Sequence, residues 1–385
     1  MKKIEELFVE KYGVSPQVVA NAPGRLEILG NHTDYNEGIV LSTAVDQSTE
    51  FALCPVEGRI CRLHDFRDGS DRVFSLDEID TPEAGDWANY VKGVVSQLKK
   101  RGIEIGAFDG AILSTVPLSA GMSSSAALEV SASFAFKEAF NIELSNEEWA
   151  RIGQGVENEY IGVNTGLLDQ FSSIFGRKDS LILSDFRTVE VLKPVPLPQG
   201  YNIIVVNSMV KHNLVDSEYN VRRLACESAF AKLQQQYSSI KALRDVSSAM
   251  LEEGKALLTA DEYSKAKHVV EECERVHQAT ELLEEGDVAA FGELLFASHE
   301  SSKNNFDNSC DELDFLIEQA RSLPGCIGAR LSGGGFGGIS IHLVEEERAE
   351  EYCRLIAAAF KLQTGKETET IICSAGSGAA VRRID

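Results

Sequence analysis

VPLSAGMSSSAALEV, residues 116–130, carries the chain from a strand into a helix through a loop of small residues. The strand runs into Pro117, and Ser123–Ser125 open an apolar helical segment. The free N–H groups and the dipole of that helix would face whatever occupies the loop, which predicts an anion site. The same serines also suit a helix N-cap with no ligand. The loop is not a Walker A motif, since no Gly-Lys-Ser or Gly-Lys-Thr follows.

Toward the N-terminus, GRLEILGNHTDYNEG, residues 24–38, gathers many hydrogen-bonding side chains between glycines, just after an apolar strand and Pro23. Asparagine is at home in turns, so Tyr35 and Asn36 could serve only to shape the loop. That reading leaves the arginine, the histidine and the aspartate of the same segment to be explained.

Toward the C-terminus, VENEYIGVNTGLLDQF, residues 156–171, places Glu157 at the end of a helical pattern and Asp169 among apolar neighbours. An aspartate on an apolar segment is costly unless it is paired or liganded. The alternative is a helix cap, because Asp169 follows Gly166 at a possible helix start.

LSGGGFGG, residues 331–338, formally matches G-x-G-x-x-G at Gly333, Gly335 and Gly338. The strand-like ISIHLV follows, whereas a dinucleotide fold requires a helix at that point, so we reject a dinucleotide site. The glycines indicate either a backbone that a ligand approaches closely or a hairpin with several positive-φ residues.

Composition is that of a globular protein long enough for about two domains, with 385 residues of which 43% are hydrophobic. A formal charge of −23, from 37 basic and 60 acidic residues, argues against sequence-independent binding of nucleic acid, so small molecules are the expected partners. The eight cysteines form no C-x-x-C pair, the N-terminal segment is charged throughout, and the apolar runs are too short to cross a bilayer. We therefore expect a cytoplasmic protein with reduced thiols and no membrane association.

Runs rich in β-branched residues alternate with longer stretches of helical periodicity. Strands are predicted within residues 39–54, 110–116, 201–208, 328–344 and 368–376, and helices within 123–140, 146–162, 217–300 and 344–363. This alternation predicts an α+β or mixed α/β protein with a domain boundary near residue 180.

Together the motifs resemble the three signatures of the GHMP small-molecule kinases, in the same order, and the galactokinase branch is the most similar. Further support comes from HTDYN (32–36), WANYVKGV (87–94), GLLDQF (166–171), VVNSMVKHNLVDSEYNVRR (205–223), and ASHESS followed by CDELD. The resemblance covers nearly the whole chain. It implies an α+β fold with an N-terminal ribosomal-protein-S5-like α/β domain (1–182), a C-terminal ferredoxin-like α+β domain (183–385) and an active site between them.

The resemblance also implies an activity, the ATP-dependent phosphorylation of the C1 hydroxyl of galactose, in a monomer or a homodimer. Asp169 would be the catalytic carboxylate facing the anomeric hydroxyl, and Arg25 would lie beside it and the transferring phosphate. A guanidinium favours the charged form of a carboxylate, so Asp169 would be a weak base, which phosphoryl transfer through a loose transition state tolerates. The alternative is that the two residues form only a buried structural ion pair.

By the same resemblance, the loop of residues 116–126 wraps the nucleotide phosphates, and two aromatic residues lie against the adenine. The implied nucleotide-binding residues are Trp87, Tyr90, Pro117, Ser119, Ala120, Gly121, Met122, Ser123, Ser124, Ser125 and Ala126, with Gly333, Gly334 and Gly335 as the backbone of the third motif. Ser124 or Ser125 would hold Mg²⁺ with Glu157, because magnesium needs few protein oxygens beside those of the phosphates. Trp87 and Tyr90 could instead be ordinary core aromatics at positions i and i+3.

For the sugar, the resemblance implies that Asp34 accepts hydrogen bonds from two ring hydroxyls and that Asn31 and His32 meet the C6 end. Gly166 would border the same pocket, and Tyr219 would close it. A sugar offers hydroxyls at fixed positions, and a buried polar group left unpaired by the wrong epimer carries a large energetic penalty.

Asn31 and Ser119 depart from the pattern of the branch. Galactokinases usually carry glutamate where this chain has Asn31, and asparagine lacks the charge that would repel a C6 carboxylate. The hypothesis is therefore a looser specificity at C6 that admits a uronic acid or another 6-modified galactose. Ser119 replaces a usual glycine of the second motif.

Two alternatives remain from the sequence. The first is another C1 sugar kinase, acting on galacturonate, N-acetylgalactosamine or arabinose. The second is a ligand sensor that binds galactose and ATP without catalysis. Such sensors lack a Ser-Ala dipeptide in the second motif, which SSSAAL (123–128) retains here.

Overall fold

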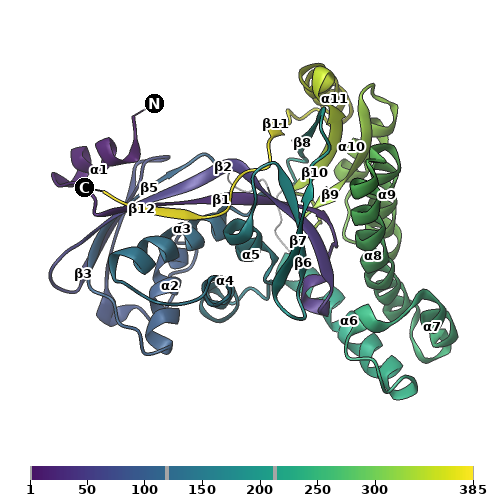
Figure 1. Cartoon of the computed structure of the whole chain (residues 1–385), viewed down its shortest axis with the longest axis horizontal. Coiled ribbons are helices and arrows are strands. Elements are labelled where there is room, and N and C mark those ends of the chain that lie inside the picture. Colours follow the sequence, from purple (N-terminus) through teal and green to yellow (C-terminus); the bar gives the residue numbers. More distant parts are fainter. Residues whose placement is uncertain (1, 118–120, 211–214, 385) are drawn as a thin grey trace.

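Two β-sheets organise the chain in a computed structural model that describes residues 2–117, 121–210 and 215–384 (Figure 1). The first sheet contains β1 (Val18–Leu29), β2 (Ile39–Pro55), β3 (Ile60–Asp65), β4 (Ser70–Ser75), β5 (Phe108–Ser114), β6 (Ser180–Asp185), β7 (Glu190–Pro196) and β12 (Ala380–Arg383). The second contains β8 (Tyr201–Asn207), β9 (Cys326–Ser332), β10 (Ile339–Glu345) and β11 (Thr370–Cys373), in the order β11-β8-β10-β9.

The long strands β1 and β2 form the spine of the first sheet. They pair antiparallel from Val18↔Leu53 to Leu29↔Leu41. On its other edge β2 pairs with β6 through its first part and with β5 through its last part, so one strand connects two regions of the sheet. β1 thereby reaches from the far end of the first sheet to the second sheet.

Helices cover the first sheet on both faces. Residues of β1 and β2 alternate between two cores, as expected when successive side chains point to opposite faces. Val19 and Ala52 pack on α1 (Ile4–Tyr12). Val18 and Phe51 face the larger core, which is built with α2 (Asn89–Lys100), α3 (Ser124–Ala139), α4 (Asn146–Gly155) and α5 (Leu168–Phe175).

The remaining helices are α6 (Val215–Gln236), α7 (Ser248–Glu253), α8 (Ala260–Glu285), α9 (Val288–Ser301), α10 (Asp311–Ser322) and α11 (Ala349–Thr364). The last three pack on the second sheet, whereas α6 and α7 pack on α8 (Figure 1). Wide π turns follow α4 at Val156–Ile161 and α9 at Ser302–Phe306. Short 3-10 turns lie at Asp34–Asn36, Leu76–Glu78, Leu243–Asp245, Lys255–Leu257 and Glu346–Arg348.

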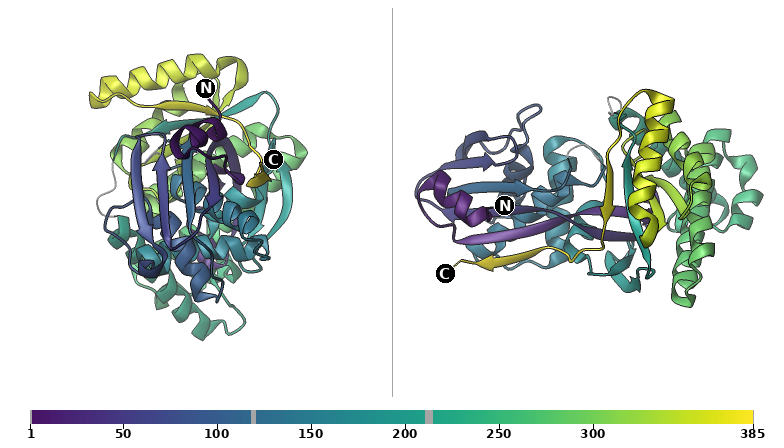
Figure 2. Two further views of the ribbon diagram at one scale, coloured as in Figure 1. Left: turned by 90° about the vertical axis from the view of Figure 1, so that its left-hand side faces the viewer. Right: turned by 90° about the horizontal axis from the view of Figure 1, so that it is seen from above.

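A shared hydrophobic core joins the two sheets. Leu26 and Ile28 of β1 pack in it with Val205 of β8 and Ile341 of β10. The chain also returns at its end, because β12 pairs with β1 in the first sheet, and Figure 2 shows both termini at the same end of the molecule. The site described below lies where the shared core ends.

The predicted mixture of strands and helices is confirmed, with two sheets and helices packed on them. One helix is shorter than its periodicity suggests: residues 146–162 form α4 only to Gly155, and then widen into the π turn. The predicted boundary between residues 182 and 183 lies inside β6, and β7 extends the same sheet to Pro196.

Within the described residues, no helix combines the length and the apolar character that crossing a membrane requires. All eight cysteines are free thiols.

Candidate active site

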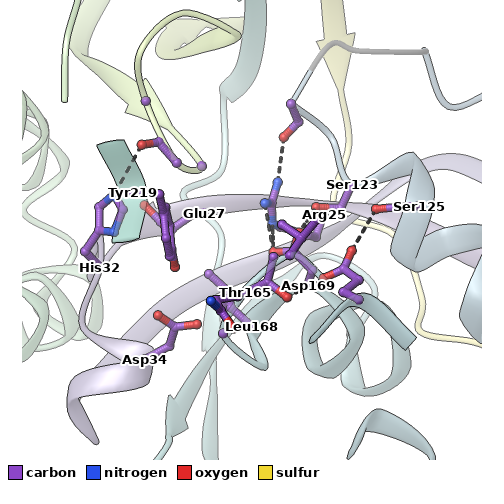
Figure 3. Close-up of a pocket in the computed structure, with 18 of the residues that line it drawn as sticks. Arg25, Glu27, His32, Asp34, Ser123, Ser125, Thr165, Leu168, Asp169 and Tyr219 are labelled. Atoms are coloured by element: carbon purple, nitrogen blue, oxygen red, sulfur yellow. Dashed lines mark hydrogen bonds and ion pairs between the residues drawn. The ribbon is translucent and has the colours of Figure 1, made fainter. Parts of the chain in front are cut away.

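A cavity of about 470 Å³ lies between β1, the start of α3, the start of α5 and the loop that connects β9 to β10 (Figure 3). Segments far apart in the sequence thus supply its walls, and Tyr90 of α2 and Tyr219 of α6 also line it. The three motifs predicted to carry chemistry all contribute lining residues.

Arg25 and Asp169 form the centre of this cavity. Nε of Arg25 donates a 2.8 Å hydrogen bond to Oδ1 of Asp169, and Nη1 donates to the carbonyl of Gly121 at 2.6 Å. The preceding Gly24 allows this approach, because a Cβ there would lie 2.6 Å from the carbonyl oxygen of Met122. The guanidinium of Arg25 therefore hydrogen-bonds both the second motif and the carboxylate of Asp169.

The serines that open α3 point their hydroxyls at carboxylates. Ser123 occupies the N-cap position with φ of 55° and makes no side-chain cap; its hydroxyl donates to Oδ2 of Asp169. Ser125 donates to Oε1 of Glu157 at 3.1 Å. The N-terminal N–H groups of α3 are not satisfied by these serines, so they remain available to an anion in the cavity.

Glu157 lies on the π turn that follows α4, and its side chain is buried. Thr165 donates to its Oε2 at 2.5 Å. Burial and the nearby Asp169 raise the pKa of Glu157 above its usual range, although hydrogen bonds from Thr165, Gln170 and Ser125 oppose the shift. Glu157 is thus a buried carboxylate near a second, partly exposed one, Asp169, which is paired with Arg25. A hydroxyl and a carboxylate are hard oxygen donors, and this set fits Mg²⁺.

Asp34 and Gly166 meet at the other end of the cavity. A Cβ on Gly166 would lie 1.6 Å from Oδ2 of Asp34, so only glycine leaves room for this carboxylate. Burial raises the pKa of Asp34 to about 6, and the backbone N–H groups of Tyr35 and Leu168 oppose that shift. The result is a carboxylate aimed at the cavity with little room to move.

His32 is fixed by hydrogen bonds on both ring nitrogens. Nδ1 lies 2.8 Å from the hydroxyl of Tyr35, and Nε2 lies 3.2 Å from the carbonyl oxygen of Gly334. Burial lowers the pKa of His32 to about 3, so the ring is neutral. A carbonyl oxygen only accepts, so the proton resides on Nε2 and Nδ1 accepts from Tyr35. Tyr219 packs against this ring with centroids 5.0 Å apart.

Asn31 is held from both sheets. Its Nδ2 donates to Oε1 of Glu27 and to the carbonyl of Gly333, each at 2.8 Å. Its backbone is held from α8, because Oε1 of Glu272 accepts from its N–H at 3.3 Å and His268 Nε2 lies 3.1 Å from its carbonyl oxygen. The second half of the chain thus fixes the loop that contributes one end of the cavity.

Most of the residues predicted from the sequence line the cavity. They are Arg25, Asn31, His32, Asp34, Tyr90, Gly121, Ser123, Ser124, Ser125, Glu157, Gly166, Asp169, Tyr219, Gly333, Gly334 and Gly335. Trp87, Pro117, Met122 and Ala126 are outside this lining, and Ser119 and Ala120 lie outside the described residues. Trp87 packs on the larger core of the first sheet and donates from Nε1 to Oγ of Ser70 at 3.0 Å.

Glu27 was missed, although it lines the cavity. A signal for it exists in the sequence, because positions 25 and 27 of one strand point to the same face. Thr165 and Leu168 also line the cavity, beside predicted residues.

Three protein-family models match segments of this chain. A model described as the GHMP kinases N terminal domain matches residues 89–177, and one described as GHMP kinases C terminal matches residues 279–361. The two-sheet fold and its cavity are therefore those of a GHMP-type small-molecule kinase. A model of the galactokinase galactose-binding signature matches residues 6–55.

Individual relatives identify the branch of the family. A galactokinase of Roseiflexus sp. (strain RS-1) is 39% identical over 381 residues, covering 98% of this chain and 96% of the relative. A galactokinase of Actinobacillus pleuropneumoniae serotype 3 (strain JL03) is 40% identical over 377 residues, covering 96% of each. The crystal structure of Lactococcus lactis galactokinase complexed with galactose matches with a TM-score of 0.92 and 32% identity, covering 98% of both chains. The chain belongs to the galactokinase family.

Proposed function

We propose that this protein transfers the γ-phosphoryl group of ATP to the C1 hydroxyl of galactose, giving galactose 1-phosphate and ADP. The observation that carries the proposal is the convergence of Arg25, Asp169 and the N-terminus of α3 on one cavity. A cationic group, a proton acceptor and a set of free N–H groups are what a phosphoryl transfer to an alcohol needs.

Asp169 orients the attacking hydroxyl and takes up its proton. The hydrogen bonds from Arg25 and Ser123 hold both carboxylate oxygens in place, so the group meets its substrate already oriented. Arg25 stabilises charge on the transferring phosphoryl group. The backbone also fixes the guanidinium, because Nη1 of Arg25 donates to the carbonyl of Gly121.

The start of α3 receives the triphosphate. Ser124 and Ser125 lie at the opening turn, with Glu157 across from Ser125 at 3.1 Å. Mg²⁺ held by Ser124 or Ser125 and Glu157 would supply charge neutralisation of the phosphate oxygens. Tyr90, which lines the cavity, is the better placed of the two proposed adenine contacts, whereas Trp87 is engaged with Ser70.

The sugar binds at the end of the cavity that Asp34, His32 and Tyr219 form. Asp34 accepts hydrogen bonds from ring hydroxyls, and neutral His32 and Asn31 lie toward the C6 end of the sugar. The eight free cysteines suit a reducing compartment, which supports the cytoplasm as the place of the reaction. A monomer or a homodimer stays a prediction.

An ADP-coupled assay with purified protein, ATP, Mg²⁺ and galactose tests the proposal. We expect ADP release that depends on galactose, and galactose 1-phosphate as the product, identified by ³¹P NMR. Tight binding of both ligands without any ADP would contradict an enzyme and favour the sensor. Turnover of another sugar at a higher kcat/KM than galactose would replace the substrate and keep the reaction.

A further inference from the structure

Glu27 is an acidic group at the sugar end of the cavity whose role no motif assigns. It lies on β1, two residues after Arg25, and lines the same cavity although its side chain is only 5% exposed. Its Oε1 accepts from Asn31 Nδ2 at 2.8 Å and from Nη1 of the wholly buried Arg330 at 3.1 Å. One oxygen of this carboxylate is therefore anchored.

The other carboxylate oxygen of Glu27, Oε2, is not held in this way by the part of the protein that the structure describes. Among the described residues Oε2 of Glu27 has no hydrogen-bond partner, and it is not one of the fully enclosed unpaired atoms. Because Glu27 lines the cavity, this oxygen is accessible from it. Figure 3 shows Glu27 beside Tyr219, between His32 and Arg25. It is thus an acceptor aimed at the position that the sugar would occupy.

Asn31, by contrast, has no hydrogen-bonding capacity left for a ligand. Its two amide hydrogens go to Glu27 and to the carbonyl of Gly333. Its Oδ1 accepts from Asn308 Nδ2 at 3.0 Å and from Ser302 Oγ at 3.4 Å. A primary amide offers two donors and two lone pairs, and the protein uses all of them. Asn31 is therefore placed to hold Glu27 and the loop of the third motif together.

The charge at this end of the cavity is unfavourable for an anion. Glu27, Asp34 and Asp169 all line the cavity, and among the described residues that line it Arg25 is the one Arg or Lys side chain, paired with Asp169. Arg330 is wholly buried and pairs with Glu27 through Nη1. A sugar carboxylate placed here would meet three carboxyl groups and, among the described residues that line the cavity, no unpaired cationic side chain.

We propose that Glu27 determines sugar specificity at the Asn31 end of the cavity, accepting a hydrogen bond from a neutral hydroxyl and excluding a sugar that carries a carboxylate there. This inference rests on the proposed function. It reverses the expectation drawn from the sequence, in which asparagine at position 31 removed the charge that rejects a uronic acid. In this proposal the negative charge that rejects a uronic acid belongs to Glu27, on β1, four residues before Asn31.

Glu27→Gln tests the proposal, because glutamine keeps the shape and the acceptor while removing the charge. ADP-coupled kinetics with galactose and galacturonate, and with 6-deoxygalactose as a neutral analogue, give the specificity ratios. We expect wild-type kcat/KM for galacturonate to lie at least roughly 100-fold below that for galactose, and Glu27→Gln to narrow this gap by roughly tenfold or more. The KM for galactose should rise more than kcat falls, because the contact is present before and during the transfer.

Two further variants separate specificity from folding. Glu27→Asp retains the charge, so it should keep the exclusion of galacturonate even where its shorter chain raises the KM for galactose. Ser332→Ala removes a hydroxyl that bonds the backbone of Glu27 at 3.0 and 3.1 Å and is the control for a structural effect at the same residue. It should leave the galacturonate-to-galactose ratio unchanged.

The outcomes are distinct. A wild type that phosphorylates galacturonate as well as galactose, or a folded Glu27→Gln variant with unaltered ratios, overturns the role of Glu27 while the kinase function stands. Where Glu27→Gln does not fold, a Glu27→Asp variant that loses the exclusion overturns it as well. A wild type that phosphorylates no sugar overturns the proposed function itself.

Discussion

Arg25 and Asp169 are 144 positions apart in the chain, yet Nε of the arginine lies 2.8 Å from Oδ1 of the aspartate. Arg25 projects from β1, a strand of the first sheet, and Asp169 projects from α5, a helix packed on that sheet. The side chain of Arg25 is 7% exposed and that of Asp169 is 25% exposed, and both residues line the cavity.

Asp169→Asn should remove most of the turnover and leave nucleotide binding nearly intact. Asparagine still accepts from Arg25, but it cannot take up the proton of the hydroxyl, so kcat should fall by roughly 10²–10⁴. Steady-state kinetics and calorimetric titration with ADP measure the two effects. Asp77→Asn breaks an exposed pair with Arg59 and should leave both unchanged. An unaltered kcat in the Asp169 variant would refute the assignment.

Arg25→Lys should also be damaging, because an ammonium group cannot bond Asp169 and the carbonyl of Gly121 in the geometry of the planar fork. We expect a loss in kcat of roughly 10²-fold, less than the loss of about 10³–10⁵ when a whole arginine is missing in comparable phosphoryl transfers. Single-turnover kinetics separate this loss from slower product release. A variant with wild-type single-turnover rates would show that the guanidinium serves the fold only.

The pH dependence of kcat/KM for the sugar should show an acidic limb from Asp34. Burial raises its pKa to about 6, and only the ionised carboxylate accepts from two hydroxyls. The kcat/KM for galactose should therefore increase as the pH rises through about 6 and level off above it. Asp34→Asn should flatten this limb as it lowers kcat/KM overall. If the limb persists unchanged in the variant, it belongs to another group.

Gly166→Ala should weaken sugar binding without unfolding the protein. The added Cβ would lie 1.6 Å from Oδ2 of Asp34, so the carboxylate must move away from its place in the cavity. We expect kcat/KM for galactose to fall by roughly tenfold or more, about 1.4 kcal/mol. Gly106→Ala is the matched control, because its Cβ would meet only a ring carbon of Phe140 at an ordinary 3.6 Å. Equal kinetics for the two variants would contradict the proposed role of Asp34.

Much of this site could be predicted from the sequence because its motifs are local. Within residues 116–130 the signals of a loop that leads into a helix, a proline, small residues and a run of serines, are adjacent in the sequence, and Asp169 stands out as a charge on an apolar segment. Gly166 could be connected with the sugar pocket, although the reason, the carboxylate of Asp34 beside its Cα, requires the structure.

What could not be predicted depends on tertiary packing. Arg330 is 303 positions from Glu27. Three of the four groups that bond the side chain of Asn31, those of Ser302, Asn308 and Gly333, are 271 to 302 positions away from it. Asn31 was interpreted from its residue type alone, whereas its contacts decide its role. The π turn at Val156–Ile161 also escaped prediction, because a helical periodicity does not distinguish an α-helix from a single wide turn that re-aims Glu157.

Glu129 gives a prediction about stability. This fully buried residue of α3 accepts from Nε2 of Gln170 at 2.8 Å, while Oε1 of Glu129 and Oε1 of Gln170 are both buried without a partner. A proton on Glu129 would supply the donor that this pair of acceptors lacks. Burial, and next the charge of Glu157, raise the pKa of Glu129 well above its usual range, in agreement with a neutral acid.

The sign of the pH effect follows from this shift. Between the ordinary pKa of 4.5 and the higher pKa in the folded state, the folded protein binds more protons than the unfolded chain, so Glu129 lowers the free energy of unfolding as the pH rises.

Glu129→Gln does not titrate and resembles the neutral acid. The variant should therefore gain stability relative to the wild type as the pH is raised from about 4.5 to 8, measured by urea unfolding at each pH. Glu143→Gln, at an exposed position, should show no such trend. A difference between Glu129→Gln and the wild type that stays constant with pH would contradict a raised pKa of Glu129 in the folded protein.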